Sequence, residues 1–338
     1  MASGPVISVC IANFNGIELI DACIASVKAQ DCAATVEIIV HDDASTDGSA
    51  ERIRTRYPDV RLIISPENVG FCVANNRMAK AAQGKYLLLL NNDATLLPDA
   101  LGVLLREAGR LARPAILTLP QYDFATGKLL DIGCRLDPFL NPVPNLDAHR
   151  HDVGMVMGAC LWIDKLLWDN LGGFPEWFGS IGEDLYLCCR ARLAGFPVRA
   201  LGISGYRHRV GQSFGGGTAR GGKLATTFRR RALSERNKTY VMALTYPAPF
   251  MQFALPLHLL LLLVEGGLLS ILLGRLAYLK EIYLPVFAAI FGQRKLLANG
   301  RRSIMVERRL ASADFYAAFD PVPYKLRMLL RYGLPRLS

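Results

Sequence analysis

The stretch Tyr86–Asp99, which reads YLLLLNNDATLLPD, decides the fold. Its apolar part, Leu87–Leu90, is typical of a central strand that is covered on both faces. Two amides and one acid follow directly, Asn91, Asn92 and Asp93. A carboxylate just past a buried strand needs a partner, because burying an unpaired charge is costly. A divalent cation such as Mg²⁺ or Mn²⁺ that bridges to a diphosphate is a partner of the right kind.

Strands and helices alternate around this stretch through the first third of the chain. Apolar runs rich in β-branched residues predict further strands at Val6–Ala12, Val36–His41 and Val60–Ser65. Segments with helical spacing lie at Ile17–Gln30, Ser49–Tyr57, Val73–Ala82 and Pro98–Leu111. This alternation predicts a mostly parallel α/β sheet with helices on both faces.

The middle third is less regular. Gln121–Asp152 is rich in Pro, Asp, Asn and Gly, which predicts irregular loops or short strands. An apolar run follows at Met155–Ile163, and we expect a helix over Glu183–Ala194 and a strand over Val198–Ile203. A glycine-rich loop is expected at Gly211–Gly222.

Polar side chains gather where the predicted strands end. Asn13–Asn15 follows the first strand, and the pair Asp42 and Asp43 follows the second. Ligands of open α/β sheets bind outside the carboxyl ends of the strands, so we expect these groups to meet Asp93 at one site. Turn formation is the alternative for Asp42 and Asp47, because Asp is common in turns.

Two further signals lie later in the chain. Glu183 and Asp184 open a predicted helix, where a carboxylate is either a helix cap or a general base for an acceptor hydroxyl. His208 stands in YRHRVGQSFGGG, and it is either a structural histidine or a metal ligand on a mobile loop.

The C-terminal third differs in composition from the rest. Residues from Arg220 onward hold 19 Lys and Arg against 6 Asp and Glu, whereas residues 1–219 hold 20 against 23. Phe250–Leu273 is apolar and long enough to span a bilayer, but Pro256, His258 and Glu265 interrupt it. We therefore expect helices that lie in the interface of an anionic membrane. A true span or re-entrant hairpin and an ordinary buried helical subdomain are the alternatives.

These changes in charge and apolar content along the chain predict two domains. Residues 1–222 form the catalytic domain, with a donor-binding half at about 1–120 and an acceptor half at about 121–222. Residues 223–338 form a basic, apolar helical region that opens with a helix at Lys223–Leu244. Eight scattered cysteines without a zinc or disulfide pattern fit a reducing cytosol, and no signal peptide is expected. The expected location is the cytoplasmic face of the inner membrane, peripheral or monotopic.

Four motifs in their order resemble the family-2 nucleotide-sugar glycosyltransferases of the GT-A fold. They are VCIANFNG, VHDDASTDGS, NNDATLLPD and GEDLYLCCR, within a resemblance that covers about residues 5–215. The resemblance implies a GT-A (Rossmann-like) catalytic domain and an inverting, metal-dependent transfer of a sugar from a nucleotide-diphosphate donor. The third motif departs from the family's Asp-x-Asp pattern, because an amide replaces its first acid.

The resemblance also implies roles for single residues. The backbone at Ala12 and the side chain of Phe14 would hold the base, and Asp43 would bind the edge of a pyrimidine ring. The other donor-binding candidates are Asn15, Asp42, Asn76, Arg77, Asn91 and Asn92.

The same resemblance assigns the reacting side of the site. Asp93 would hold Mg²⁺ or Mn²⁺, with His208 as a further metal or phosphate contact. Asp184 would be the catalytic base, and Glu183 would orient it or contact the acceptor.

The phrase NVGFCVANN at Asn68–Asn76 most resembles the rhamnosyltransferase-like branch of the family. This branch implies a dTDP- or UDP-sugar donor and a lipid-linked or glycan acceptor in cell-envelope polysaccharide assembly. The Gln-x-x-Arg-Trp motif of processive synthases is absent from the sequence, which favours limited sugar addition.

Other functions fit less well. An oxidoreductase would need Gly-x-Gly-x-x-Gly after the first strand, where only Gly16 occurs. A sugar-phosphate nucleotidyltransferase would need a basic, glycine-rich loop at the same place. A membrane-bound scaffold with a vestigial nucleotide site is the non-enzymatic alternative. We expect no nucleic-acid partner, since no recognisable binding module accompanies the basic residues.

Overall fold

The computed structural model describes residues 4–210, 216–220, 223–333 and 336–337. It divides into two compact units. The N-terminal unit comprises Met1–Cys134, Pro144–Ala191 and Phe196–Arg209, and the C-terminal unit comprises Arg135–Val143, Arg192–Gly195 and Val210–Ser338. The domain boundary expected at residue 222 falls outside the described residues, and so do positions 211–215 and 221 of the expected glycine-rich loop.

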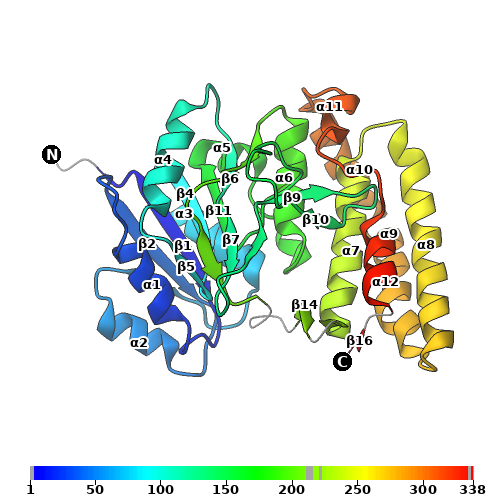
Figure 1. Cartoon of the computed structure of the whole chain (residues 1–338), viewed down its shortest axis with the longest axis horizontal. Coiled ribbons are helices and arrows are strands. Elements are labelled where there is room, and N and C mark those ends of the chain that lie inside the picture. Colours follow the sequence, from blue (N-terminus) through cyan, green and yellow to red (C-terminus); the bar gives the residue numbers. More distant parts are fainter. Residues whose placement is uncertain (1–3, 211–215, 221–222, 334–335, 338) are drawn as a thin grey trace. The chain divides into compact units, whose positions relative to one another are not determined.

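A seven-stranded sheet forms the centre of the N-terminal unit (Figure 1). Its strands, in spatial order, are β12 (Val198–Ala200), β6 (Ile116–Thr118), β11 (Cys160–Asp164), β4 (Tyr86–Asn91), β1 (Ile7–Asn13), β2 (Val36–Asp42) and β3 (Arg61–Ile64). Only β11 runs against its neighbours β4 and β6. The prediction of a mostly parallel sheet is therefore confirmed.

Helices cover both faces of this sheet, as predicted. The helices of the unit are α1 (Ile20–Lys28), α2 (Ser49–Arg56), α3 (Phe71–Ala81), α4 (Ala100–Arg110), α5 (Lys165–Leu171), the 3-10 turn η1 (Glu176–Phe178) and α6 (Glu183–Leu193). The main apolar core joins α1, α2 and α4 to the β1 side chains Ile7, Val9 and Ile11. Helix α3 packs against β1 and β2 from the other face.

A second sheet begins where β4 ends. Its four strands, in spatial order, are β5 (Ala94–Leu96), β13 (Tyr206–His208), β7 (Gln121–Asp123) and β8 (Leu129–Asp131). The irregular segment after Gln121 thus contains short strands, including the paired β9 (Cys134–Leu136) and β10 (Pro142–Pro144). The apolar run Met155–Ile163 is a strand only from Cys160 onward.

The C-terminal unit is mainly helical. Its helices are α7 (Phe228–Thr245), α8 (Phe250–Leu272), the π-helix η2 (Tyr278–Tyr283), α9 (Leu284–Gly292), α10 (Arg294–Val306), α11 (Ser312–Tyr316) and α12 (Tyr324–Tyr332). A small core of Leu262, Leu269, Tyr278, Ile282, Tyr283 and Val286 joins α8, η2 and α9.

The predicted helix over Lys223–Leu244 starts later than expected. Lys223–Thr226 forms β15, which pairs with β14 (Gly216–Arg220) and β16 (Arg336–Leu337), so part of the expected glycine-rich loop is a strand. Thr227 caps α7, because its hydroxyl accepts a hydrogen bond from the Arg230 amide at 3.1 Å. The cap places the start of the helix at Phe228.

Candidate active site

Asn13 ties together the carboxyl ends of three neighbouring strands. Its side-chain amide donates to Asp42 Oδ2 and to the Ser49 hydroxyl, both at 2.9 Å, and its Oδ1 accepts from Asn92 Nδ2 at 2.9 Å. The side chain is almost fully buried, so these bonds satisfy polar groups that water does not reach. A Cβ at Gly16 would overlap the Asn13 and Asn92 side chains, which explains the glycine there.

The two acids of the second motif have different surroundings. Asp42 is 1% exposed and accepts from the Ser45 amide at 3.0 Å as well as from Asn13, so it acts as a turn-forming residue here. Asp43 Oδ1 accepts from the Val69 amide at 2.8 Å, and Oδ2 accepts from the Gly70 amide at 2.9 Å. Asp43 thereby holds the loop that leads into α3.

The aromatic and amide candidates after β1 lie beside these acids. Phe14 is 52% exposed, so its ring offers an open apolar surface at this edge of the sheet. Asn15 has a positive φ of 48° and accepts from the Thr46 amide at 2.8 Å. Ala12 lies inside β1, between His41 of β2 and Asn91 of β4.

Asp93 and His208 meet although they are far apart in the sequence. Strand β13 pairs with β5 in a register that sets His208 opposite Ala94, and the Arg209 amide donates to the Asp93 carbonyl at 3.1 Å. His208 Nε2 consequently lies 3.0 Å from Asp93 Oδ1. His208 is the last residue of β13, whereas the metal-ligand alternative had placed it on a mobile loop.

The surroundings of this pair suit a cation. His208 Nδ1 lies 3.3 Å from Gln121 Oε1, which also accepts from the Tyr206 hydroxyl at 2.7 Å. Donation from Nδ1–H to Gln121 would leave the Nε2 lone pair available to a metal ion, which is the arrangement found in metal-ligating histidines. Within the described ranges, no group of three or more His, Cys, Asp or Glu could hold a metal ion. Asp93 and His208 offer one carboxylate and one imidazole, which could hold a Mg²⁺ or Mn²⁺ ion together with substrate phosphates and water.

Asp184 lies at the beginning of α6 and contacts the loop before β11. Its Oδ2 accepts from the Gly158 amide at 3.0 Å. The next residue, Ala159, accepts from the Asn91 amide at 3.1 Å, so the base candidate is joined through two residues to the end of β4. Glu183 beside it is buried, at 6% exposed.

The backbone before α6 is strained. Ile181 has a φ of 70°, which is rare for a β-branched residue. Such outliers concentrate at functional sites, where the surrounding structure holds them in place. The strain therefore agrees with a functional role for the segment that presents Glu183 and Asp184.

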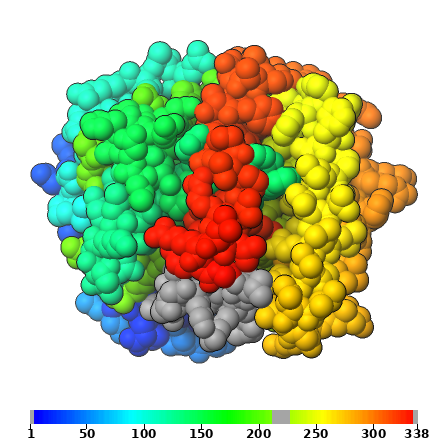
Figure 2. Space-filling model, turned by 45° about the vertical axis from the view of Figure 1, so that its right-hand side comes forward, coloured from blue at the N-terminus to red at the C-terminus, as the bar shows by residue number. Residues whose placement is uncertain are grey.

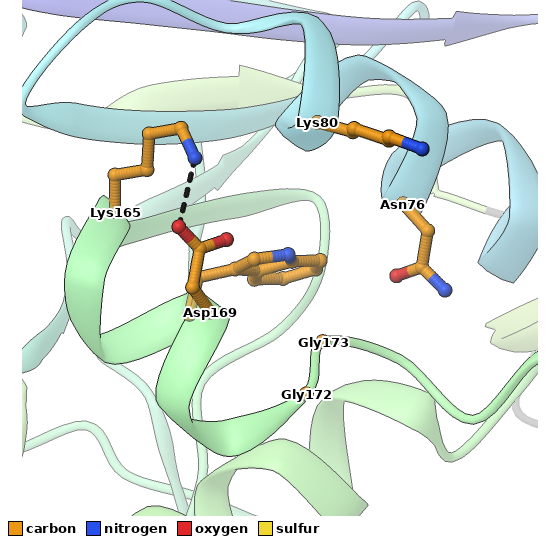
Figure 3. Close-up of a pocket in the computed structure, with 7 residues that line it drawn as sticks. Asn76, Lys80, Lys165, Asp169, Gly172 and Gly173 are labelled. Atoms are coloured by element: carbon orange, nitrogen blue, oxygen red, sulfur yellow. Dashed lines mark hydrogen bonds and ion pairs between the residues drawn. The ribbon is translucent and has the colours of Figure 1, made fainter.

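Asn76 and Arg77 of α3 make hydrogen bonds to residues outside this helix. Asn76 donates to the Phe174 carbonyl at 2.9 Å and accepts from its amide at 3.0 Å, and Arg77 donates to the Ser65 hydroxyl at 3.1 Å. Asn76 also borders a cavity of about 450 Å³. The cavity is lined by Asn76, Lys80, Lys165, Trp168, Asp169, Gly172 and Gly173 (Figure 3). None of the carboxylates Asp43, Asp93 and Asp184 borders this cavity, so it is separate from the strand-end site.

Burial also determines the protonation of the cysteine thiols. Burial raises the pKa of the Cys160 thiol to about 12. Seven of the eight cysteines are buried, and all eight are free. Cys160 is therefore protonated at neutral pH and serves as a small apolar side chain rather than as a nucleophile.

Sequence reasoning did not single out several residues that build this site. Gln121 and Gly158 belong to it only through pairing between distant segments. Neither residue follows a predicted strand, and neither carries a charge. The spacing of acids and amides after strands was the available signal, and it identified Asn13 only as part of a cluster.

Comparison with solved structures identifies the class of this fold. A mannosyltransferase from Pyrobaculum calidifontis, solved with GDP-Man and Mn²⁺, is similar with a TM-score of 0.52 at 18% identity. The alignment covers 94% of this chain and 86% of the mannosyltransferase chain. GalNAc-T7, solved with UDP, GalNAc and Mn²⁺, is similar with a TM-score of 0.62 at 14% identity. The alignment covers 98% of this chain and 59% of the GalNAc-T7 chain. These similarities show the GT-A glycosyltransferase fold.

Sequence comparison then identifies the family. Residues 8–128 match the model of glycosyl transferase family 2, and this part of the chain is a family-2 glycosyltransferase domain. The N-acetylglucosaminyl-diphospho-decaprenol L-rhamnosyltransferase of Mycobacterium tuberculosis is 27% identical over 191 residues, which cover 48% of this chain and 62% of that relative. The chain spans less than two thirds of the length of the curated relatives that it matches.

Proposed function

We propose that this protein is an inverting glycosyltransferase, which moves a sugar from a nucleotide-diphosphate donor to an acceptor hydroxyl. One observation carries the proposal: Asp93 pairs with His208 just past β4, and Asp184 is linked to the end of the same strand through Gly158 and Ala159. A metal-ligand pair and a base candidate at one strand end are the two components that such a transfer needs.

The donor would bind along the carboxyl ends of β1, β2 and β4. The exposed ring of Phe14 suits stacking on a base, and Asp43 is held nearby by two amides of the loop before α3. Asp93 and His208 would hold Mg²⁺ or Mn²⁺ against the diphosphate. When bound, the ion neutralises the charge that develops on the leaving diphosphate.

Asp184 would act as the general base. The acceptor oxygen forms a bond to the anomeric carbon, while the bond from that carbon to the diphosphate oxygen breaks and its electron pair leaves with the diphosphate. The acceptor proton moves to the Asp184 carboxylate, whose other contacts include the Gly158 amide. Direct displacement of this kind inverts the anomeric centre, by the same geometry as in inverting hydrolases.

The names of two relatives support the proposed substrate class. The mycobacterial relative is named for rhamnosyl transfer to a diphospho-decaprenol acceptor, and another relative, from Rhizobium meliloti, is named as a succinoglycan biosynthesis protein. We propose a dTDP- or UDP-sugar donor, with rhamnose as one candidate, and a lipid-linked or polysaccharide acceptor in cell-envelope glycan assembly. Residues 223–338 would hold the enzyme at the cytoplasmic face of an anionic membrane.

The first test is a donor screen. UDP-glucose, UDP-N-acetylglucosamine, dTDP-rhamnose and GDP-mannose are each added with Mn²⁺, and the unfolding temperature is measured. A bound donor raises it by mass action. We expect protection by a dTDP- or UDP-sugar, followed by transfer to a lipid-linked acceptor with inversion. A product with the donor's anomeric configuration would refute direct displacement.

Substitution of Asp184 tests its role as the base. Asp184→Asn keeps the size of the side chain and one of its two acceptor oxygens but cannot take the proton, so we expect a loss of roughly 10²- to 10⁴-fold in transfer. Donor affinity, measured by calorimetry with Mn²⁺, is expected to stay within a few-fold of wild type. Asp169→Asn is the matched control, since Asp169 is exposed and pairs with Lys165 beside the separate cavity. Unchanged transfer in Asp184→Asn would refute the assignment.

A further inference from the structure

Helix α8 has two sharply different faces. Its buried residues are Ala254, His258, Leu262, Gly266, Leu269 and Ser270, which recur at helical spacing. They pack against other helices of the C-terminal unit. A Cβ at Gly266 would lie 2.7 Å from the Tyr283 ring of η2, and the Thr239 hydroxyl of α7 lies 2.9 Å from His258 Nε2.

The opposite face of α8 is apolar and exposed over the whole length of the helix. Its large exposed hydrophobic residues are Phe250, Phe253, Leu257, Leu260, Leu261, Leu263, Val264, Leu268, Ile271 and Leu272. Phe253 is 70% exposed and Ile271 is 78% exposed. Gln252 is the only polar side chain among the exposed residues of this helix. The 23 residues make a strip roughly 34 Å long, and Figure 2 shows the helix, in yellow, at the surface.

A strip of this extent is unusual on a protein that stays in water. Exposed apolar patches of such size mark surfaces that contact a membrane or a partner. We call the exposed residues of α8 given above the α8 strip.

The single charged residue of α8 points away from the α8 strip. Glu265 pairs with Arg231 of α7 at 2.7 Å and with Lys325 of α12 at 2.6 Å. Lys325 and Arg231 also pair with Glu235, which is 1% exposed. Burial by itself would raise the pKa of Glu235, but Lys238, Lys325 and Arg231 hold that pKa well below its usual value. The charges of the unit's interior are therefore satisfied within the protein.

The same network argues against a transmembrane path for α8. Helix α7 packs along α8 and carries Arg229, Arg230, Arg231, Glu235, Arg236 and Lys238. If α8 crossed the bilayer, this partner would carry its charges into the hydrocarbon, where charged side chains are costly. A helix with one apolar face and one face bound to charged protein instead lies in the plane of the interface.

The residues beside α8 favour an anionic lipid surface over an apolar protein surface. Helix α12, joined to α8 by Lys325, exposes Leu326, Leu329 and Leu330 together with Arg331, whereas its Arg327 pairs with Asp320 at 3.2 Å. Arg275, just past the end of α8, is also exposed. The chain has no Asp or Glu after Asp320. Apolar side chains interleaved with cations are the pattern of helices that bind anionic leaflets.

We propose that the C-terminal unit is monotopic, with α8 lying in the plane of an anionic bilayer and the α8 strip inserted into the boundary between headgroups and acyl chains. Glu265 faces the protein, and the exposed cations Arg275 and Arg331 contact lipid phosphates. This inference rests on the proposed membrane association but not on the proposed transfer reaction. It adds the face, the orientation and the depth of the contact.

Vesicle co-sedimentation of the full chain tests which face binds. Vesicles of phosphatidylethanolamine with phosphatidylglycerol are compared with vesicles of phosphatidylcholine, each at low and raised salt. We expect binding to the anionic vesicles that weakens with salt, and a loss of at least tenfold in Phe253→Glu and Ile271→Glu. Leu166→Glu is the matched control, because Leu166 is 72% exposed but lies on α5 of the N-terminal unit.

Depth measurement separates an in-plane helix from a span and does not depend on the charged variants. Phe253→Trp, Leu260→Trp and Ile271→Trp are each bound to vesicles whose lipids carry bromine at known depths, and the wild-type fluorescence is subtracted. An in-plane helix gives the same shallow quenching depth at all three positions. If α8 spanned the bilayer, the tryptophan at position 260 would be quenched most strongly by bromines near the bilayer centre, and those at positions 253 and 271 by bromines nearer the two surfaces. That result would overturn the proposal.

The other outcomes of the vesicle experiments also test the proposal. If Phe253→Glu and Ile271→Glu bind vesicles as well as the wild-type protein does, the α8 strip is not the surface that contacts the membrane. Wild type that ignores both kinds of vesicle would refute membrane association altogether, and the donor screen above would still report separately on transfer. Circular dichroism of every variant establishes that its helices are intact.

Discussion

Asp93 and His208 form a pair only because two short strands meet in one register. Neither side chain could hold a divalent ion alone, and together they supply one carboxylate and one imidazole. Magnesium and manganese sites in nucleotide enzymes often take the rest of their ligands from substrate phosphates. The pair therefore predicts that metal binding and donor binding depend on each other.

Substitution of Asp93 tests this coupling. In Asp93→Ala, we expect Mn²⁺-dependent donor affinity, measured by calorimetry, to fall by about tenfold or more, since a charge-assisted ligand is lost. Donor binding without metal should change little. Asp99→Ala is the control from the same motif, because Asp99 is exposed and bonds to the Ser204 hydroxyl at 2.6 Å. A wild-type Mn²⁺ response in Asp93→Ala would overturn the metal assignment.

Asp131 makes stability depend on pH. Burial raises the pKa of this carboxyl to about 7, against an ordinary value of 3.8. Between pH 4 and 7 the unfolded chain has lost this proton while the folded chain keeps it, so stability falls as pH rises through this range. Above pH 7 the cost is constant, and it is at most about 4 kcal/mol.

The variant Asp131→Asn should remove this pH dependence. Asparagine keeps the oxygen that accepts from the Gly133 amide and carries no charge. We expect a gain in the free energy of unfolding at pH 8 and little change at pH 4.5, measured by urea denaturation. An equal effect at both values would show that burial does not perturb Asp131.

At the scale of elements, the turn before β4 packs tightly on β1. A Cβ at Gly84 would lie 2.7 Å from the Ser8 amide nitrogen, and the Gly84 amide donates to the Ser8 hydroxyl at 2.8 Å. Backbone cannot move aside as a flexible side chain can. The position of β4 beside β1 therefore depends on a residue without a side chain.

Two glycine substitutions distinguish the effect of this packing on stability from the effect of helix propensity. Gly84→Ala should lower the free energy of unfolding by about 1 to 3 kcal/mol, because overpacking shifts the backbone. Gly109→Ala, in α4 with open space around it, should raise it by up to about 1 kcal/mol. Thermal and urea denaturation of both variants provide the comparison. A neutral Gly84→Ala would mean that β1 and β4 can separate at little cost.

Elements differed in how well the sequence predicted them. The strands β1, β2 and β4 lie close to their predicted ranges, because a buried parallel strand reads as an unbroken apolar run. The antiparallel direction of β11 and the short strands β5 and β13 were not predicted, and β7 lies in a segment for which irregular loops or short strands were expected without individual bounds. Three-residue strands are too short to carry a periodic signal, and their pairing depends on partners far away in the chain.

At the scale of the whole molecule, the charge is divided along the chain. Residues before Arg220 are slightly acidic and those after it strongly basic, so an anionic partner for the C-terminal part could be predicted from composition. The structure adds that part of this charge is internal. Glu235, Lys238 and Arg231 satisfy one another, so only the exposed cations remain to bind lipid.

Local patterns in the chain were enough to predict a parallel α/β sheet, the acids at its strand ends and an apolar helix near the C-terminus, because periodicity and turn chemistry act over a few residues. Tertiary contacts alone decided that His208 meets Asp93 and that Glu265 turns toward Arg231 and Lys325. Each of these outcomes depends on which distant segments pair and on which face of a helix is covered. Those are energies of packing between segments, and no short window of sequence contains them.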